Sequence, residues 1–322
     1  MAEILMEAKD LKKHFPVRKG FFMREVGSVK AVDGVDITVR KGETLGLVGE
    51  SGCGKSTLGR TLIRLYEPTA GTINFRGGNF LDLGGKQLRE QRRNVQMIFQ
   101  DPYASLDPRM TVGQILEQPY EIHNLFTPTE RLAKVQNLLK LVGLKPSHVN
   151  RYPHEFSGGQ RQRISIARAI ALEPDLIICD EPVSALDVSI QAQILNLLKD
   201  LQQKLNLTYI FISHDLSVIE HFCDRVAVMY LGKIVELAER DTLFRDPKHP
   251  YTQALLASIP RFGEGRRDMK RVLTGEIPSP LNPPSGCPFH PRCPHKMDIC
   301  PTKMPALIGT TEQQKVACWL YE

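Results

Sequence analysis

The apolar positions of this chain alternate between short runs typical of strands and longer amphipathic runs typical of helices. Val35, Ile37 and Val39 alternate with polar neighbours, which predicts a half-buried strand. Further strands are predicted at residues 44–48, 72–75, 95–99, 176–179 and 208–212. Helices are predicted at residues 55–65, 111–125, 129–142, 160–172 and 188–205. Strands that alternate with helices predict an α/β fold with a largely parallel sheet, interrupted by a helical subdomain at about residues 101–160.

The pattern changes after about residue 245, where prolines become frequent and regular periodicity fades. We therefore expect two parts, residues 1–245 and residues 246–322. Hydrophobic residues make up 42% and charged residues 24% of the 322 positions, which excludes disordered and collagen-like chains. The net charge of +6 is mild, so it allows an anionic partner without requiring one.

No apolar run reaches the ~18–20 residues that a membrane-spanning helix needs. The first residues lack the basic start and apolar stretch of a signal peptide. We expect a cytoplasmic protein whose contact with a membrane comes through partners.

A phosphate-binding loop is predicted between the strand at 44–48 and the following helix. The segment reads G-E-S-G-C-G-K-S, the pattern G-x-x-x-x-G-K-[S/T] in its expected strand–loop–helix context. Its residues are Gly49, Glu50, Ser51, Gly52, Cys53, Gly54, Lys55 and Ser56, and Thr57 continues into the helix. Lys55 supplies positive charge to the β- and γ-phosphates of a bound nucleotide, and the Ser56 hydroxyl can bind Mg²⁺.

Two carboxylates end the apolar strand at 176–179. Ligands bind at the carboxyl ends of strands in an open α/β sheet, which places Asp180 and Glu181 at the same site as the loop. Asp180 fits the acid that holds Mg²⁺, and Glu181 fits a general base that polarises the attacking water.

Four further motifs give the chain a resemblance to the ATPases of the ATP-binding-cassette (ABC) family. The sequence F-S-G-G-Q at 156–160 is similar to the family's signature LSGGQ, with Phe156 in place of Leu. Gln100 stands at the glutamine-loop position, 184–187 (S-A-L-D) matches the D-loop, and His214 stands at the switch-histidine position. The resemblance implies a P-loop NTPase fold with a RecA-like parallel-sheet core, an antiparallel β subdomain and a helical subdomain.

The resemblance also implies roles for these residues. Two cassettes sandwich two ATP molecules, so that the loop of one faces the signature and D-loop of the other, here Ser157, Gly158, Gly159, Gln160 and Asp187. His214 contacts the γ-phosphate, and Gln100 senses the nucleotide and joins Ser56 and Asp180 around Mg²⁺. Phe15 is the candidate for stacking on adenine, although residues 17–29 behind it look like an insertion.

The C-terminal part resembles the extension of the peptide and nickel importer subfamily through its H-P-Y sequence at 249–251, and the whole chain is most similar to the second ATPase subunit of dipeptide importers. This implies a peripheral subunit at the cytoplasmic face of the bacterial inner membrane, which energises uptake of dipeptides or short oligopeptides. Implied partners are a second ABC ATPase subunit, for which we favour a heterodimer, two transmembrane permeases and a periplasmic or extracellular solute-binding protein. Alternatives are an importer of nickel or another small solute, and a soluble ABC ATPase acting on ribosomes or nucleic acid through the basic stretch 261–271.

Four cysteines gather in the last 36 positions: Cys287, Cys293, Cys300 and Cys318. Four thiolates can hold Zn²⁺ or a [4Fe–4S] cluster, and the wide spacing without C-x2-C pairs favours the larger cluster. The subfamily resemblance also implies a cluster in this extension. Zinc and unligated thiols stay open, as does a ligand role for His290 or His295.

Overall fold

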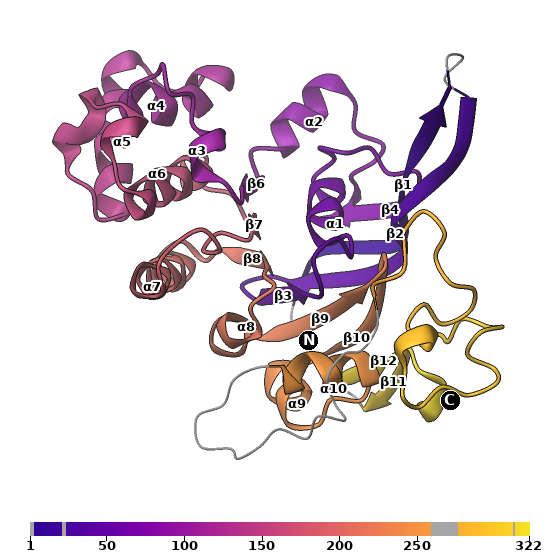
Figure 1. The fold of residues 1–322 in the computed structure, drawn as a ribbon. Coiled ribbons are helices and arrows are strands. Elements are labelled where there is room, and N and C mark those ends of the chain that lie inside the picture. Colours follow the sequence, from indigo (N-terminus) through magenta and orange to yellow (C-terminus); the bar gives the residue numbers. More distant parts are fainter. Residues whose placement is uncertain (1–2, 21–23, 259–275, 312) are drawn as a thin grey trace.

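A computed structural model describes residues 3–20, 24–258, 276–311 and 313–322. Two sheets and a helical layer make up the molecule, and a C-terminal extension packs beside them (Figure 1). The basic stretch 261–271 lies outside the described residues. Within the described ranges, none of the helices has the length and apolar character needed to span a lipid bilayer.

An eight-stranded sheet forms the centre of the molecule, in the order β11-β12-β10-β9-β3-β8-β7-β6. Five neighbouring strands are parallel: β9 (Arg225–Tyr230), β3 (Thr44–Val48), β8 (Thr208–Ile212), β7 (Leu176–Asp180) and β6 (Val95–Ile98). Every residue of β3, β7 and β8 is buried, which explains their unbroken apolar runs. The α/β fold and the strands predicted at these three positions are confirmed.

A smaller antiparallel sheet of four strands packs over the first helix. Its order is β2 (Arg24–Arg40), β1 (Ile4–Lys19), β4 (Ala70–Phe75) and β5 (Gly78–Asn79). The strand predicted around Val35–Val39 is part of β2. Within the stretch 17–29, which looks like an insertion in the sequence, the described residues 17–20 and 24–29 belong to the outer end of the β1–β2 hairpin, where Val17 pairs with Gly27 and Phe15 with Val29.

The helical layer lies on one side of the main sheet (Figure 1). It contains α3 (Pro102–Ser105), α4 (Val112–Ile122), α5 (Pro128–Leu141) and α6 (Gly158–Ile170). Capping boxes at Thr111, Thr127 and Ser157 start three of these helices. The remaining helices are α1 (Lys55–Leu62), α2 (Gly85–Gln91), α7 (Val188–Leu205), α8 (Leu216–Phe222), α9 (Arg240–Arg245) and α10 (Pro250–Ala257).

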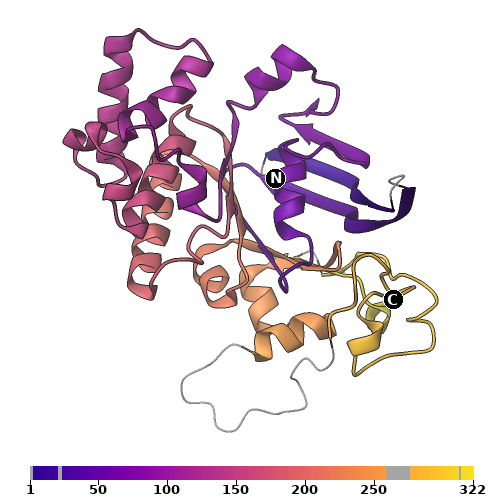
Figure 2. The ribbon, with the colours of Figure 1, turned by 45° about the horizontal axis from the view of Figure 1, so that its top comes forward.

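The described part of the C-terminal extension contains regular structure within its proline-rich sequence. Two short strands, β11 (Ile308–Thr311) and β12 (Gln314–Val316), continue the main sheet beyond β10 (Lys233–Glu239). The buried carboxylate of Glu236 on β10 accepts hydrogen bonds from the Nε2 of Gln314 and from the backbone N–H groups of Lys248 and His249. Figure 2 shows the extension beside the sheets and away from the helical layer.

Candidate nucleotide-binding site

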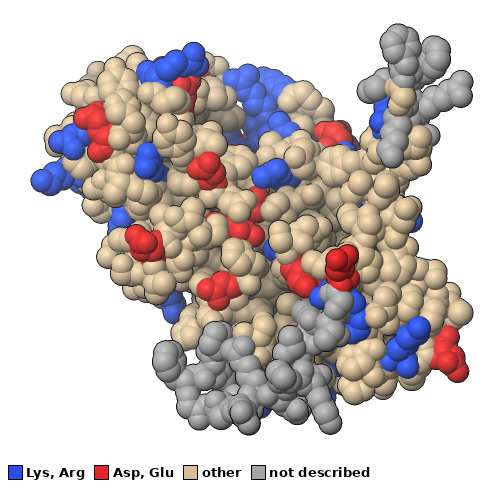
Figure 3. Space-filling view, viewed as in Figure 1, with Lys and Arg blue, Asp and Glu red and all other residues tan. Residues whose placement is uncertain are grey.

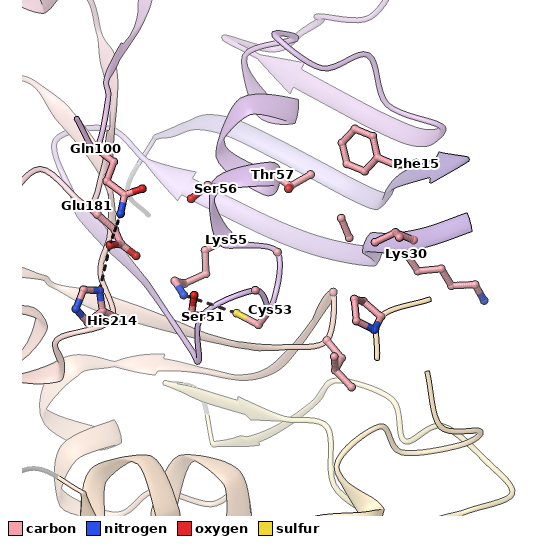
Figure 4. A pocket seen from close by; sticks show the side chains of 17 residues that line it. Phe15, Lys30, Ser51, Cys53, Lys55, Ser56, Thr57, Gln100, Glu181 and His214 are labelled. Atoms are coloured by element: carbon pink, nitrogen blue, oxygen red, sulfur yellow. Dashed lines mark hydrogen bonds and ion pairs between the residues drawn. The ribbon is translucent and has the colours of Figure 1, made fainter. Parts of the chain in front are cut away.

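A cavity of about 620 Å³ opens at the carboxyl ends of the parallel strands (Figure 4). Its size is within the range of small-molecule sites. Several segments line it: Phe15, Val29, Lys30, Ala31, Ser51, Gly52, Cys53, Gly54, Lys55, Ser56, Thr57, Gln100, Glu181, His214, Leu231, Gly232 and Pro280. Most of the residues predicted for the nucleotide site therefore share one cavity.

The loop between β3 and α1 takes a backbone path that requires glycine. Gly49, Gly52 and Gly54 have φ values of 152°, 79° and 109°. A Cβ at Gly54 would lie 2.0 Å from the carbonyl oxygen of Ala31, and one at Gly49 would lie 2.2 Å from that of Met229. Gly54 caps α1 without a side-chain hydrogen bond, which leaves the first amides of the helix available to an anion.

Lys55 and Ser56 lie at the start of α1, next to the strand-end acids. The Nζ of Lys55 donates to the carbonyl oxygens of Gly49 and Glu50 at 2.8 and 3.1 Å. The Oγ of Ser56 donates to Asp180 at 2.6 Å. Asp180 is fully buried and also pairs with Arg60 at 3.3 Å, so it lies behind Ser56 and does not line the cavity. A hydroxyl beside a carboxylate is a donor set that Mg²⁺ accepts.

Three polar side chains converge where β6, β7 and β8 end. The Oε2 of Glu181 accepts a hydrogen bond from the Nε2 of Gln100 at 3.0 Å and lies 3.1 Å from the Nδ1 of His214. Glu181 has φ 47°, a left-handed conformation uncommon for a residue with a side chain, and its N–H donates to the carbonyl of Ile212. The strand order thus brings together three residues that the sequence separates by up to 114 positions (100 to 214).

Phe15 lies on the opposite side of the loop from this polar group (Figure 4). Its ring makes an edge contact with Tyr66 at 5.5 Å, and the Nζ of Lys13 lies 4.9 Å from its centre. An aromatic ring at one end of the cavity, with Lys55 and the amides of the loop beyond it, suits a molecule with a base and a phosphate tail. The cavity is also lined by three residues that the sequence analysis missed: Lys30, Gly232 and Pro280. No sequence motif includes them and could have indicated that they line the site.

The signature residues lie apart from the cavity of their own chain. Ser157 is exposed and caps α6, where its Oγ accepts from the N–H of Gln160 at 3.4 Å. A Cβ at Gly159 would lie 2.5 Å from Ile190 of α7, and Gly158 lies against Leu186, so signature and D-loop adjoin each other. Ser157, Gly158, Gly159, Gln160 and the exposed Asp187 are all absent from the lining of the cavity.

The four C-terminal cysteines line one small cavity, together with His249, Phe289, His290 and His295. Burial raises the pKa of Cys287 and of Cys318 to about 11, and the neighbouring thiols act in the same direction. Among the residues that the structure describes, however, no three or more His, Cys, Asp or Glu side chains are arranged to hold a metal ion. The four thiols line the same small cavity, but their arrangement gives no support to iron–sulfur or zinc ligation.

Comparisons with known proteins agree with this geometry. Residues 32–184 match the family described as ABC transporter, and residues 235–300 match the C-terminal region of oligopeptide/dipeptide transporters. The chain is 58% identical to the oligopeptide transport ATP-binding protein AppF of Bacillus subtilis, with 99% of this chain and 98% of AppF covered. It is 53% identical to a probable peptide ABC transporter ATP-binding protein, y4tS, of Sinorhizobium fredii, over 99% of this chain and 90% of y4tS.

Among solved structures, the chain is similar to the ATP-binding cassette MJ0796, described as dimeric and bound to ADP and Pi. The TM-score is 0.65 at 28% identity, and the match covers 73% of this chain and 99% of that one. A similar match, with a TM-score of 0.65 at 26% identity over 76% of this chain and 92% of the other, is to cbiO1 from Clostridium perfringens, part of the cbiONQ transporter complex.

Proposed function

This chain belongs to the ATP-binding subunits of ABC transporters, and within them we infer that it is the ATPase subunit that energises a peptide importer. The observation that carries this is one cavity that joins Lys55 and Ser56 to Glu181 and His214, in a chain whose peptide-transport relatives match it nearly end to end. We assign residues 1–245 to the ATPase domain, with a helical subdomain at about 101–160, and residues 246–322 to the extension.

ATP fits the cavity with its adenine beside Phe15 and its phosphates over the loop. The N-terminal amides of α1 and the charge of Lys55 hold the phosphates. Mg²⁺, held by Ser56, Asp180 and Gln100, would neutralise phosphate charge as it develops. Glu181 takes the proton of the attacking water, while Gln100 and His214 hold the Glu181 carboxylate in place.

A second cassette completes the site. The exposed surface that carries Ser157, Asp187 and Val188 (82% exposed) lies outside the cavity of its own chain. Ser157 and the amides that follow it form a second helix N-terminus for the γ-phosphate of an ATP bound by the partner. We expect a different ATPase subunit as this partner.

Permease subunits dock on the groove between the main sheet and the helical layer. A cavity of about 370 Å³ lies there, lined mainly by apolar side chains such as Met97 and Phe99. Leu65 and Ile122 at its rim are 46% and 45% exposed, as suits contact with an apolar partner surface. A permease docked there would lie close to Gln100, which follows Phe99, and the importer function implies that this contact is made at the cytoplasmic face of the inner membrane.

A [4Fe–4S] cluster at Cys287, Cys293, Cys300 and Cys318 is proposed from the spacing of these cysteines and from the resemblance of the extension to that of peptide importers. Bound there, a cluster would cross-link the extension. Anaerobically purified protein should absorb broadly near ~400 nm and contain iron and labile sulfide. Colourless protein with one zinc per chain would contradict this assignment.

The runner-up, an ATPase acting on ribosomes or nucleic acid, has less support. On the face shown in Figure 3, Lys and Arg gather over α2 and are elsewhere interspersed with Asp and Glu, and they form no continuous basic stripe across the described residues drawn there. Co-purification from solubilised membranes distinguishes the two functions. Two permeases and a second cassette subunit support the importer, and recovery of ribosomes would favour the runner-up.

Transport itself is tested by reconstituting the full complex in liposomes. Uptake of dipeptides or oligopeptides should require ATP and should be lost with Lys55→Ala. ATP-driven uptake of nickel without peptide would correct the substrate class.

A further inference from the structure

The C-terminal extension reaches back to the nucleotide-binding loop through one arginine. Arg292 lies in a short 3₁₀ helix (His290–Arg292) between Cys287 and Cys293. Its guanidinium donates to both carboxylate oxygens of Glu50, at 2.7 and 3.0 Å. The two side chains are only 5% and 20% exposed. A bidentate, largely buried pair of this kind fixes the orientation of both partners.

A second contact from the extension holds the backbone of the same loop residue. The N–H of Glu50 donates to the hydroxyl oxygen of Tyr251 at 2.8 Å. Tyr251 lies on α10 and is fully buried, with its ring packed against Tyr230 at 4.7 Å and Phe289 at 5.4 Å. Phe289 also lines the cysteine cavity. The amide and the carboxylate of Glu50 are therefore both held by residues beyond position 245.

Glu50 connects these contacts to the site without lining the cavity itself. Its carbonyl accepts from the Nζ of Lys55 at 3.1 Å, and the residues that follow it, from Ser51 onward, line the cavity. Holding Glu50 thus fixes the start of the loop and the position of Lys55. A loop that is already ordered loses less conformational entropy when its ligand binds.

We propose that Arg292 and Tyr251 are positioning residues of the ATPase, which preorganise the phosphate-binding loop through Glu50. The inference rests on the proposed ATPase function and assigns part of the nucleotide affinity to the extension. Pro280 of the extension, whose carbonyl accepts from the N–H of Lys30, lines the other end of the same cavity. The extension thus contacts the nucleotide site at two places.

Steady-state ATP hydrolysis by the assembled transporter tests this through three variants: Arg292→Met, Glu50→Gln and the double variant. Arg292→Met keeps the bulk of the side chain and removes its charge. We expect the KM for ATP to rise about tenfold, equivalent to about 1.4 kcal/mol, with kcat within about twofold of wild type. Because both single variants break the same pair, the double variant should be no worse than either. Arg292→Lys should restore part of the affinity.

Arg225→Met is a matched control. Arg225 forms another largely buried pair with Glu43, at 3.0 Å, at the opposite end of β3 from the loop. Its loss should lower the thermal unfolding midpoint and leave the KM unchanged. A purely structural role for Arg292 would give this same pattern and would overturn the proposal.

Two further measurements keep the outcomes distinct. If Arg292→Met does not fold, Tyr251→Phe removes only the hydroxyl, and an unchanged KM in that variant overturns the proposal. Lys55→Ala tests the premise. If Lys55→Ala weakens ATP binding and the Arg292 and Tyr251 variants do not, the inference is wrong and the ATPase function stands. If Lys55→Ala has no effect on ATP binding, the proposed function itself fails.

Discussion

Replacing Glu181 by Gln should separate ATP binding from ATP hydrolysis. The amide keeps the size of the side chain, and its oxygen can still accept the hydrogen bond from the Nε2 of Gln100, now 3.0 Å from Oε2. Both residues carry a Cβ, so the left-handed φ of 47° is equally costly before and after the change. The pocket should therefore retain its shape and bind ATP within about twofold of wild type.

Glu181→Gln should slow the chemical step of ATP hydrolysis. An amide cannot take a proton from water, and a positioned general base contributes about 10²–10⁴-fold to a rate. At 1.36 kcal/mol per tenfold, kcat should fall by an amount equal to about 3–5 kcal/mol. Glu181→Asp is the matched control. Glu181→Asp keeps a carboxylate base, but its shorter side chain moves that carboxylate away from Gln100 and His214. The Asp variant should therefore hydrolyse ATP faster than the Gln variant.

Phosphate release by the assembled transporter measures kcat, and a fluorescent ATP analogue measures binding. Hydrolysis at the wild-type rate by Glu181→Gln would refute the assignment of the base. Loss of ATP binding together with hydrolysis would refute the claim that the carboxylate acts only in the chemical step.

Three other perturbations test separate parts of the structure. Gly54→Ala should abolish ATP binding and lower the thermal unfolding midpoint, because the new Cβ would lie 2.0 Å from the carbonyl oxygen of Ala31. Unchanged binding in a titration with ATP would contradict the loop geometry. Phe15→Ala should weaken ATP by about fivefold, or ~1 kcal/mol, with less effect on inorganic triphosphate, and equal effects on both ligands would remove the stacking role. Burial lowers the pKa of His249 from 6.5 to about 3. The Nδ1 of His249 must also stay unprotonated to accept the hydrogen bond from the N–H of Tyr251. Between these two pH values the imidazole therefore binds a proton in the unfolded chain but not in the folded chain. Stability should fall by up to about 1.4 kcal/mol per pH unit between pH 6.5 and 3, and urea unfolding of His249→Gln should show a shallower pH dependence.

The parts of the site that the sequence predicts are those in which local chemistry specifies local structure. The glycines of the loop, the charge of Lys55 and the acids after β7 each follow from a short segment in a strand–loop–helix context. The convergence of Gln100, Glu181 and His214 follows because neighbouring parallel strands end at one edge of the sheet.

Other features depend on contacts that no local pattern encodes. Glu50 and Arg292 are 242 positions apart, so the pair that joins the loop to the extension is visible only in the folded chain. The bulges of β1, between Ala8 and Leu11 among others, break the alternation that predicts strands, and β1 is therefore missing from the strands predicted from the sequence. The strands β11 and β12 are short and follow proline-rich sequence; β12 pairs with the edge of β10, and β11 pairs with β12.

The most direct test of the account is a structure of the assembled transporter with Glu181→Gln and Mg²⁺-ATP. The account predicts an ATP whose γ-phosphate lies against Lys55 of this chain and the signature of the partner cassette, while Ser157 of this chain meets the γ-phosphate held by the partner. A closed, nucleotide-loaded assembly in which Ser157 is remote from every γ-phosphate would contradict it.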